Sequence, residues 1–433
     1  MHVTSISLVL AATIAAVASV TLPSQDPFYV QPSNISQYSP GGVIRMRQVS
    51  PNISGFTVGG QSLGSLKALY QILYRTTDNL NNAVAAVTSV LVPENADPNK
   101  LLAYQTAYDT ADPNSVPSYA FQSGANVTET SDIVFIIAAL DQGVYVVSPD
   151  YEGLDGHYTE GIIAGHATLD SVRAAFNTAN VTGLSTSAKY AAWGYSGGSL
   201  ASEWAAELQA QYAPELEFQG FALGGLIPNI TNVLLTINQG PFAGLAFSGI
   251  TGLSRAYPDF NVTLRSYLVP SKAAEFFTIG DSSLANAASL GGFKNLFSYF
   301  TSGLALLYEP VVQSVLAKSG VMGVHGIPQA PLFIYKAAAD EISPAADSTK
   351  LVKQFCATND VSIEYHIDLL GGHVTEAITG SASALAWILD RLDGKPVSKP
   401  GQCTTEYVLL SSASLETSLV LGDELIALLQ ALL

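Results

Sequence analysis

The chain contains the pentapeptide Gly194-Tyr195-Ser196-Gly197-Gly198, which fits the G-x-S-x-G pattern of a nucleophile elbow. In that element a sharp turn between a strand and a helix lifts a serine hydroxyl into a site. The serine adopts a strained backbone conformation, and a Cβ on the neighbouring glycines would collide with the flanking strand and helix. Because the chain has 36 glycines, an ordinary glycine-rich turn is the alternative, and the surrounding sequence must distinguish the two.

The flanking residues supply the strand and the helix that an elbow requires. Residues 188–193, Ala-Lys-Tyr-Ala-Ala-Trp, predict a short buried strand. Ser199 to Tyr212 predicts a helix with one apolar face, and Pro214 limits it. The order strand, G-x-S-x-G, helix therefore favours a nucleophilic role for Ser196.

The composition describes a large, apolar and acidic globular protein. Of the 433 residues 48% are hydrophobic and only 12% are charged, about half the usual share near 25%. The net charge of −17 argues against nucleic acid as a partner, because phosphates require a basic face. It also argues against electrostatic docking on anionic membranes.

The N-terminus has the features of a secretion signal in residues 1–18. The apolar run Ser5 to Val17 is too short to span a membrane, and Ala16-Val17-Ala18 offers an A-x-A cleavage site. The alternative, a buried N-terminal helix, stays open because no Lys or Arg precedes the run. Six N-x-S/T sequons support secretion of a glycosylated protein. They begin at Asn34, Asn52, Asn126, Asn180, Asn229 and Asn261.

The two cysteines, Cys356 and Cys403, most simply form one disulfide in an oxidising compartment. Such a bond would tie the C-terminal segment to the body of the protein. The chain has no H-E-x-x-H and no C-x-x-C motif, so we expect no metal site and no cofactor.

Strand-like and helix-like patterns alternate along most of the chain, which predicts an α/β fold with a largely parallel sheet. The strands are expected at Val43–Val49, Lys67–Thr76, Ala83–Val92, Leu101–Tyr108, Gly143–Ser148, Ala330–Tyr335 and Val361–Ile367. Helices are expected at Gly161–Asn177, Ser348–Cys356 and Thr375–Leu392.

The alternation stops in residues 222–328, which are near-neutral and rich in Leu, Phe, Ala, Gly and Ser. This stretch holds five basic and four acidic residues, and it shows several short helical patterns, one of them in Gly292–Leu307. We interpret it as a helical cap, or lid, inserted over an apolar site, although a second hydrophobic core with no substrate role is the alternative. The predicted organisation is a signal in residues 1–18, a core in 19–221, the cap in 222–328, and the rest of the core in 329–433.

A nucleophilic serine needs a base, and the base needs an acid to orient it. In the α/β-hydrolase arrangement the chain order is Ser, then Asp or Glu, then His. Asp340 and Glu341 follow the expected strand that contains Phe333, and Asp340 is the preferred acid because it comes first. Glu341 is its local rival.

The base is expected on a loop after the last strand. His373 follows two glycines and precedes the last helix, so it is the preferred base. His366 is the rival, but it lies inside an alternating strand that fixes its side chain. His157 and His166 precede Ser196 and break the expected order.

The oxyanion hole of such a site is made of backbone N–H groups. One donor is expected from Gly197, the residue after the nucleophile. The other is expected from Asp109, on the loop after the strand near Leu101. Asp109 acting only as a helix or turn cap is the alternative.

Five segments together resemble the fungal secretory lipases. They are Tyr104–Thr110, Gly143–Gly153 (G-V-Y-V-V-S-P-D-Y-E-G), Gly194–Ser199, Asp340–Ile342 and Gly372–Thr375. The resemblance covers nearly the whole chain after the signal, in order and spacing. It implies an α/β-hydrolase fold with a helical lid, a triad of Ser196, Asp340 and His373, and an oxyanion hole at Asp109 and Gly197. It also implies a C-terminal disulfide between Cys356 and Cys403.

From these features we expect a secreted serine ester hydrolase, in the first instance a triacylglycerol lipase. Its substrate would be a lipid or another apolar ester, met at an oil–water interface. An esterase or deacetylase of a secondary metabolite, a serine carboxypeptidase and an inactive binding protein on the same fold are the alternatives. The apolar tail Thr417–Leu433 resembles a flap over the site, but a helix packed on the core is an equal interpretation.

Overall fold

The computed structural model describes residues 20–50, 57–58, 61–62, 66–122, 133–358 and 361–409. The predicted signal in residues 1–18, the sequons at Asn52 and Asn126, and the tail Thr417–Leu433 lie outside these residues. In the described part, no helix has both the length and the apolar character that crossing a bilayer requires.

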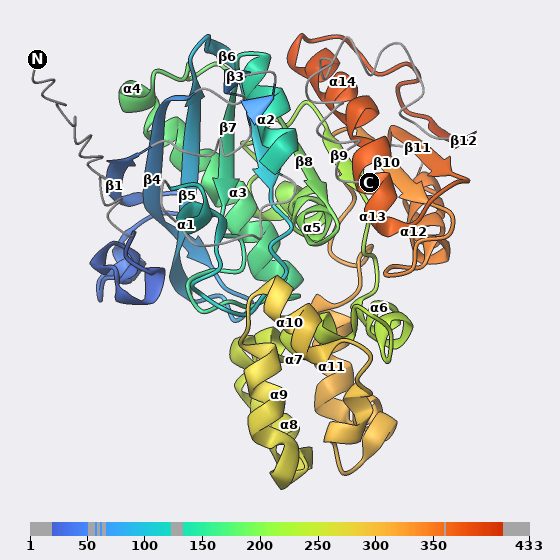
Figure 1. Cartoon of the computed structure of the whole chain (residues 1–433). Helices are drawn as coiled ribbons and strands as arrows, with labels where there is room; N and C mark the ends of the chain where they lie inside the picture. Colours follow the sequence, from blue (N-terminus) through green and yellow to red (C-terminus); the bar gives the residue numbers. More distant parts are fainter. Residues whose placement is uncertain are drawn as a thin grey trace, which may run out of the picture.

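A ten-stranded sheet forms the centre of the described residues, in the order β1-β4-β5-β7-β6-β8-β9-β10-β11-β12 (Figure 1). Strands β1, β4, β5 and β7 pair antiparallel, and every pair from β7 to β12 is parallel. The strands are β1 (Val43–Val49), β4 (Leu66–Thr77), β5 (Ala83–Pro93), β6 (Asp97–Gln105), β7 (Val144–Pro149), β8 (Lys189–Tyr195), β9 (Phe221–Gly224), β10 (Leu332–Ala337), β11 (Ile363–Asp368) and β12 (Cys403–Val408). Strands β2 (Thr57–Val58) and β3 (Gln61–Ser62) pair only with each other.

The strand order reverses at β6, which lies between β7 on one side and β8 on the other. In open parallel sheets such a reversal leaves a crevice at the carboxyl ends of the strands, and ligands bind there. Ser196 follows directly on β8, and the loop with Asp109 follows β6. The topology therefore brings these two residues to the same crevice.

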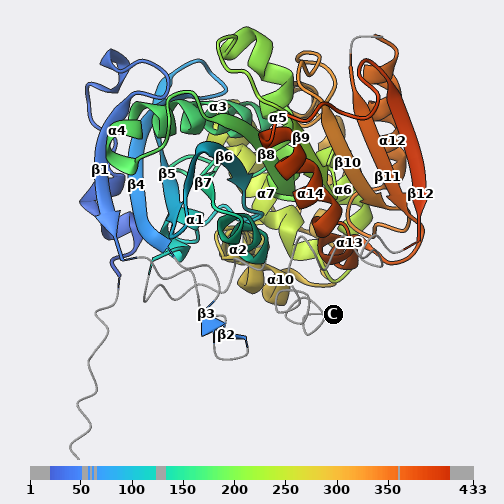
Figure 2. The ribbon, with the colours of Figure 1, turned by 90° about the horizontal axis from the view of Figure 1, so that it is seen from above.

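Helices cover both faces of the sheet (Figures 1 and 2). Helices α3, α5 and α12 contribute to the apolar cluster on one face, and α2 and α14 to the cluster on the other. The helices around the sheet are α1 (Pro117–Ala120), α2 (Ile133–Asp141), α3 (Gly161–Asn177), α4 (Ala179–Thr182), α5 (Gly197–Tyr212), α12 (Ala345–Cys356), α13 (His373–Thr379) and α14 (Ser381–Leu392).

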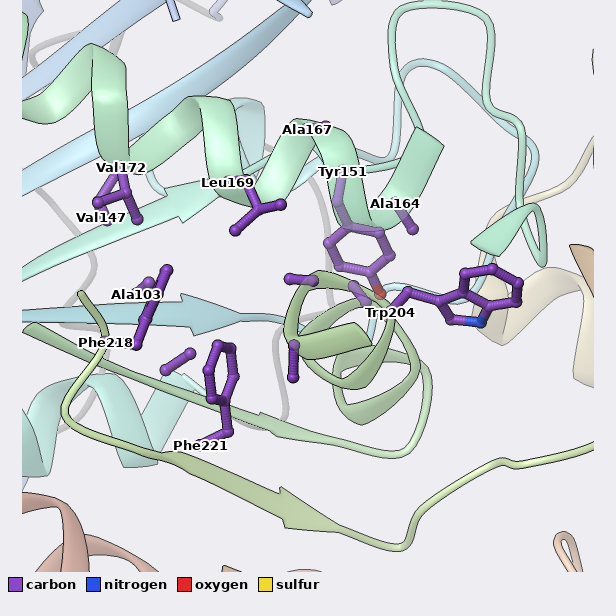
Figure 3. Close-up of a cluster of buried hydrophobic side chains, with 14 of the residues drawn as sticks. Ala103, Val147, Tyr151, Ala164, Ala167, Leu169, Val172, Trp204, Phe218 and Phe221 are labelled. Carbon is purple, nitrogen blue, oxygen red and sulfur yellow. The ribbon is translucent and has the colours of Figure 1, made fainter. Parts of the chain in front are cut away.

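Close packing of α3 against α5 holds the elbow helix in place (Figure 3). Trp204 of α5 is almost fully buried, and a Cβ on Gly161 of α3 would lie 2.0 Å from its indole ring. Only glycine fits at this approach, because a side chain there would push the two helices apart. The helix that begins at the serine is thus fixed against the sheet.

A separate helical segment lies between β9 and β10, beyond the carboxyl ends of the central strands (Figure 1). It has its own apolar core, in which the rings of Phe247, Phe276 and Tyr299 meet. Its helices are α6 (Ile230–Ile237), α7 (Ala243–Ala256), α8 (Pro258–Tyr267), α9 (Ala273–Gly280), α10 (Leu284–Gly291) and α11 (Pro310–Ser319).

The predicted fold class is confirmed, but some predicted elements are wrong in detail. The helical pattern in Gly292–Leu307 forms only two short 3-10 helices, Leu296–Tyr299 and Gly303–Tyr308. Phe293 has a left-handed φ of 61° before the first, Phe300 is extended between the two, and Gly303, which begins the second, has a φ of 56°. The last predicted helix is divided into α13 and α14 at Gly380, where a Cβ would lie 2.2 Å from the ring of Tyr335.

A disulfide joins Cys356, the last residue of α12, to Cys403, the first residue of β12. The predicted pairing is therefore confirmed. The bond lies at the edge of the sheet, where β12 pairs with β11 on one side only. Edge strands have half of their backbone groups unpaired, so a covalent link here keeps the strand in register.

Candidate active site

Ser196 occupies the turn between β8 and α5 in a backbone conformation that few non-glycine residues adopt. Its φ is 52° and its ψ is −122°. A Cβ on Gly194 would lie 2.2 Å from the carbonyl oxygen of Gly198, and a Cβ on Gly198 would lie 1.9 Å from that of Gln105. The glycines are therefore required by the close approach of β8, β6 and the helix, and the strained serine projects at their meeting point.

The structure brings Ser196, His373 and Asp340 into one hydrogen-bonded chain. His373 Nε2 lies 2.8 Å from Ser196 Oγ, and His373 Nδ1 lies 2.6 Å from Asp340 Oδ2. All three residues are buried. This order of contacts is the one in which an imidazole removes a proton from a hydroxyl while a carboxylate orients it.

Asp340 is held by four hydrogen bonds. Its Oδ1 accepts from the backbone N–H groups of Ile342 and Ser343, and its Oδ2 accepts from His373 and from the ammonium of Lys336 at 2.8 Å. Burial alone would raise the pKa of Asp340, but the hydrogen bond from His373 and the charge of Lys336 outweigh it and hold that pKa well below its usual range. The carboxylate therefore stays charged beside the imidazole.

His373 is the first residue of α13, whereas the sequence predicted it on the loop before the last helix, and its backbone is fixed by hydrogen bonds. Glu341 Oε2 accepts the backbone N–H of His373 at 2.7 Å, and the hydroxyl of Tyr195 donates to the carbonyl oxygen of His373 at 2.5 Å. Glu341, the rival acid, thus contacts the backbone of His373, whereas Asp340 contacts its ring. The rival base His366 lies on β11, where its ring contacts Phe333 and its Nε2 lies 3.7 Å from Glu406.

Asp109 and Gly197 lie side by side next to the serine. Asp109 has a left-handed φ of 41°, and its Oδ1 would lie 1.8 Å from a Cβ on Gly197. Gly197 is the first residue of α5, where the helix itself offers the backbone N–H no acceptor. A glycine is therefore needed for Asp109 to reach this place, and both residues border the space in front of Ser196.

Two cavities meet at the serine. The inner cavity has an empty volume of about 850 Å³, including space open to solvent, and runs from Ser196 into the helical segment. Its walls are largely aliphatic, with residues such as Leu253, Leu307 and Val312. The outer cavity, of about 1030 Å³, is bordered by Ser196, His373 and residues of α2, α10 and α13.

Two buried carboxyl groups, Asp368 and Glu376, form a pair where the end of β11 meets α13. Asp368 ends β11 and Glu376 lies on α13, one turn after His373. Burial, together with the negative charge of Asp368, raises the pKa of Glu376 from 4.5 to about 8. Glu376 therefore keeps its proton at neutral pH.

This pair predicts that the protein loses stability as the pH rises from about 4.5 to about 8. In that window the unfolded Glu376 has lost its proton while the folded one keeps it, so the loss approaches about 1.4 kcal/mol per unit of raised pKa. Glu376→Gln resembles the protonated form, so this variant should not show the pH-dependent loss of stability. Urea unfolding at pH 5, 7 and 9 measures the free energy of unfolding of both proteins. The stability of the variant relative to the wild type should increase as the pH rises. A difference that stays constant with pH would contradict the assignment.

Sequence reasoning missed Lys336, Tyr195 and the carboxyl pair as parts of the site. For Lys336 a signal was present, because it is the one charged residue in the apolar strand Leu332–Ala337. The pair gave no such signal, since its members belong to different elements and meet only in the folded chain.

Comparison with known proteins agrees with this geometry. Residues 120–399 match the model of a family described as secretory lipase. "Lipase A" of Arthroderma benhamiae is 39% identical over 419 residues, covering 94% of this chain and 88% of the relative. The "trichothecene C-3 esterase" of Fusarium sporotrichioides is 36% identical over 392 residues, covering 85% of this chain and 83% of the relative.

Among solved structures, Candida antarctica lipase A in its closed state superposes with a TM-score of 0.84. It is 31% identical, and the match covers 96% of both chains. The family match and these relatives extend over both the sheet and the helical segment. The chain therefore belongs to the secretory lipase family.

Proposed function

We propose that this protein hydrolyses lipid esters, triacylglycerols above all, through an acyl-enzyme intermediate. The observation that carries the proposal is the hydrogen-bonded chain Asp340–His373–Ser196, buried where an apolar cavity begins. An apolar cavity that ends on an activated hydroxyl suits a substrate with a long hydrocarbon chain and one ester group.

In the proposed reaction Ser196 Oγ attacks the ester carbonyl while His373 Nε2 takes its proton. Asp340 holds the ring so that Nε2 faces the hydroxyl, and it stabilises the imidazolium. The backbone N–H groups of Gly197 and Asp109 would receive the negative oxygen of the tetrahedral intermediate. His373 then passes its proton to the leaving alcohol. In the second half of the reaction His373 takes a proton from a water molecule, which attacks the acyl-enzyme, and returns the proton to Ser196 Oγ as the acid is released.

We assign the acyl chain to the inner cavity and the alcohol part to the outer cavity. The inner cavity has much more apolar than polar lining and begins beside Gly197, on the oxyanion side of the serine. The outer cavity includes His373, which must protonate the leaving alcohol. In this assignment the helical segment acts as the predicted cap. The predicted boundary at residue 222 falls inside β9 (Phe221–Gly224), so the cap begins after that strand and ends before β10.

Leu307→Trp is expected to shorten the acyl chain that the enzyme accepts. Leu307 lines the inner cavity, so the larger ring would fill space that a long chain needs, while acetate and butyrate esters would still fit. Hydrolysis of p-nitrophenyl palmitate should fall at least about tenfold relative to the butyrate ester, since a lost hydrocarbon contact of 1.4 kcal/mol corresponds to that factor.

The matched control is Leu304→Trp, on the same 3-10 helix. Leu304 is exposed and lies outside the cavity lining, so its substitution should leave the chain-length profile unchanged. Equal profiles for the two variants would contradict the assignment of the acyl chain to the inner cavity.

Hydrolysis of a compact acetyl ester of a secondary metabolite is the second candidate, because the Fusarium sporotrichioides relative is a trichothecene esterase. The aliphatic lining of the inner cavity continues from Ser196 to residues of α7 and α11, beyond the reach of an acetyl group, which favours the lipid. The test is a rate profile over acetate, butyrate, octanoate and long-chain glycerides, dissolved and emulsified. Rates that rise with chain length support the lipase, and activity confined to acetates would overturn it.

We further propose that the enzyme works at an oil–water interface. Val374, which borders the outer cavity, is exposed, and so are Leu369 and Leu370 just before it. Leu284, which also borders the outer cavity, begins α10, and Leu290 and Phe293 near the end of that helix are exposed. Apolar side chains around the outer cavity would contact oil without requiring attraction to anionic lipids.

We propose an extracellular location, in keeping with the family description, and glycans at the six sequons. Asn34 and Asn180 are exposed. Asn229 accepts hydrogen bonds from the first turn of α6, and Asn261 accepts one from Arg265. A removed signal in residues 1–18 completes this proposal.

A further inference from the structure

Lys336 is a fully buried cation in direct contact with the acid of the site. Its relative exposure is 0%, and its Nζ lies 2.8 Å from Asp340 Oδ2 and 2.9 Å from the carbonyl oxygen of Leu226. A buried ammonium is costly unless it is paired and hydrogen-bonded, and both conditions are met here. A lysine that served the fold alone could be an apolar residue at this position, like the rest of β10.

The position of Lys336 relative to His373 follows from the oxygen that they share. His373 Nδ1 lies 2.6 Å from Asp340 Oδ2, and Lys336 Nζ lies 2.8 Å from the same atom. The two nitrogens cannot be farther apart than the sum of these distances. A positive charge so close to the ring, in surroundings that exclude water, opposes the addition of a second positive charge.

We propose that Lys336 is a positioning residue: its ammonium orients the Asp340 carboxylate and opposes protonation of His373. The inference rests on the proposed role of the three residues in ester hydrolysis. It assigns to Lys336 no contact with the substrate, since Lys336 borders neither cavity.

Other ionisable groups face this cluster from each element packed against it. They are Tyr335 on β10, Tyr195 on β8, Asp368 on β11, Glu376 on α13, Asp347 on α12, and Glu341 beside Asp340. Burial lowers the pKa of Lys336, and the acidic groups Glu341 and Asp347 oppose this effect by favouring its charged form. Among these groups within the described residues, Lys336 is the one cation.

The test is the pH profile of kcat/KM for Lys336→Met and Lys336→Gln on a soluble p-nitrophenyl ester. Both variants remove the charge, so the acid limb of the profile should move to higher pH by roughly one unit, as expected for a charge at this distance in a partly screened interior. The amide of Lys336→Gln can still donate to Asp340, so kcat on the plateau should fall less than in Lys336→Met. KM should stay unchanged in both.

Glu341→Gln supplies a control of opposite sign. Its amide oxygen can still accept the backbone N–H of His373, but the negative charge is gone, so the acid limb should move to lower pH. General damage to the fold would not move the two sets of variants in opposite directions. An acid limb that stays in place in both Lys336 variants would overturn the inference.

Failure of the inference and failure of the proposed function are distinguishable. If Ser196 reacts with a fluorophosphonate probe and the wild type hydrolyses long-chain glycerides, the proposed function stands whatever Lys336 does. If the probe does not label Ser196, the proposed function fails before the Lys336 variants are considered.

Discussion

Replacing Ser196 with alanine is expected to lower kcat for ester hydrolysis by about four orders of magnitude or more. The hydroxyl is the only atom that His373 Nε2 contacts within hydrogen-bonding distance in the described structure, so without it no acyl-enzyme forms. The residual rate would come from the oxyanion donors and the cavities, which the substitution leaves in place. Stopped or continuous assays with p-nitrophenyl butyrate measure the loss directly.

Ser199→Ala is the matched control, because Ser199 lies three residues away in the first turn of α5 and donates to the carbonyl oxygen of Ser196. It should remain active and should still react with a fluorophosphonate probe, whereas Ser196→Ala should not react. Near-normal hydrolysis by Ser196→Ala, with a correctly folded protein, would end the assignment of the nucleophile.

The elements that could be predicted from the sequence are those with a local signature. The elbow combines two glycines, a serine, a strand and a helix within about twenty residues, and the structure has this turn at Ser196. The chain order of the acid and the base after the serine led to Asp340 and His373. In the structure His373 lies within hydrogen-bonding distance of both Asp340 and Ser196. Their catalytic roles stay predictions that the variants test.

The parts that could not be predicted depend on contacts between distant segments. Strand β9 has four residues and β12 is an exposed edge strand, so neither shows a clear hydrophobic alternation. Helix α2 is apolar on all sides because it is buried, and it therefore lacks the periodicity that identifies a surface helix. The proximity of Glu376 to Asp368 likewise arises only when α13 packs against the sheet.

Asp340 has a second charged partner besides His373. In a simple triad the carboxylate has one charged partner, the imidazolium that forms during the reaction. Here the same oxygen also pairs with the buried ammonium of Lys336, so Asp340 both compensates that charge and orients His373. Any variant that removes its charge must disturb both.

Asp340→Asn is therefore expected to lose activity and stability together. The amide would present a donor or a weaker acceptor to His373 Nδ1, which disfavours the ring tautomer that faces Ser196, and kcat should fall by about 10⁴. At the same time the ammonium of Lys336 would be buried without its counter-charge, which should cost about 3–5 kcal/mol in the free energy of unfolding. Urea unfolding and ester hydrolysis of the same preparation measure the two effects.

The double variant Asp340→Asn/Lys336→Met separates the effect on stability from the effect on activity. Removing the stranded cation should restore most of the lost stability, because a neutral apolar side chain of similar length needs no counter-charge. It should restore none of the lost activity, since the imidazole still lacks a carboxylate to orient it. If the double variant were as unstable as Asp340→Asn alone, the ion pair would not be the source of the instability, and the pairing of Lys336 with Asp340 would not govern this region of the fold.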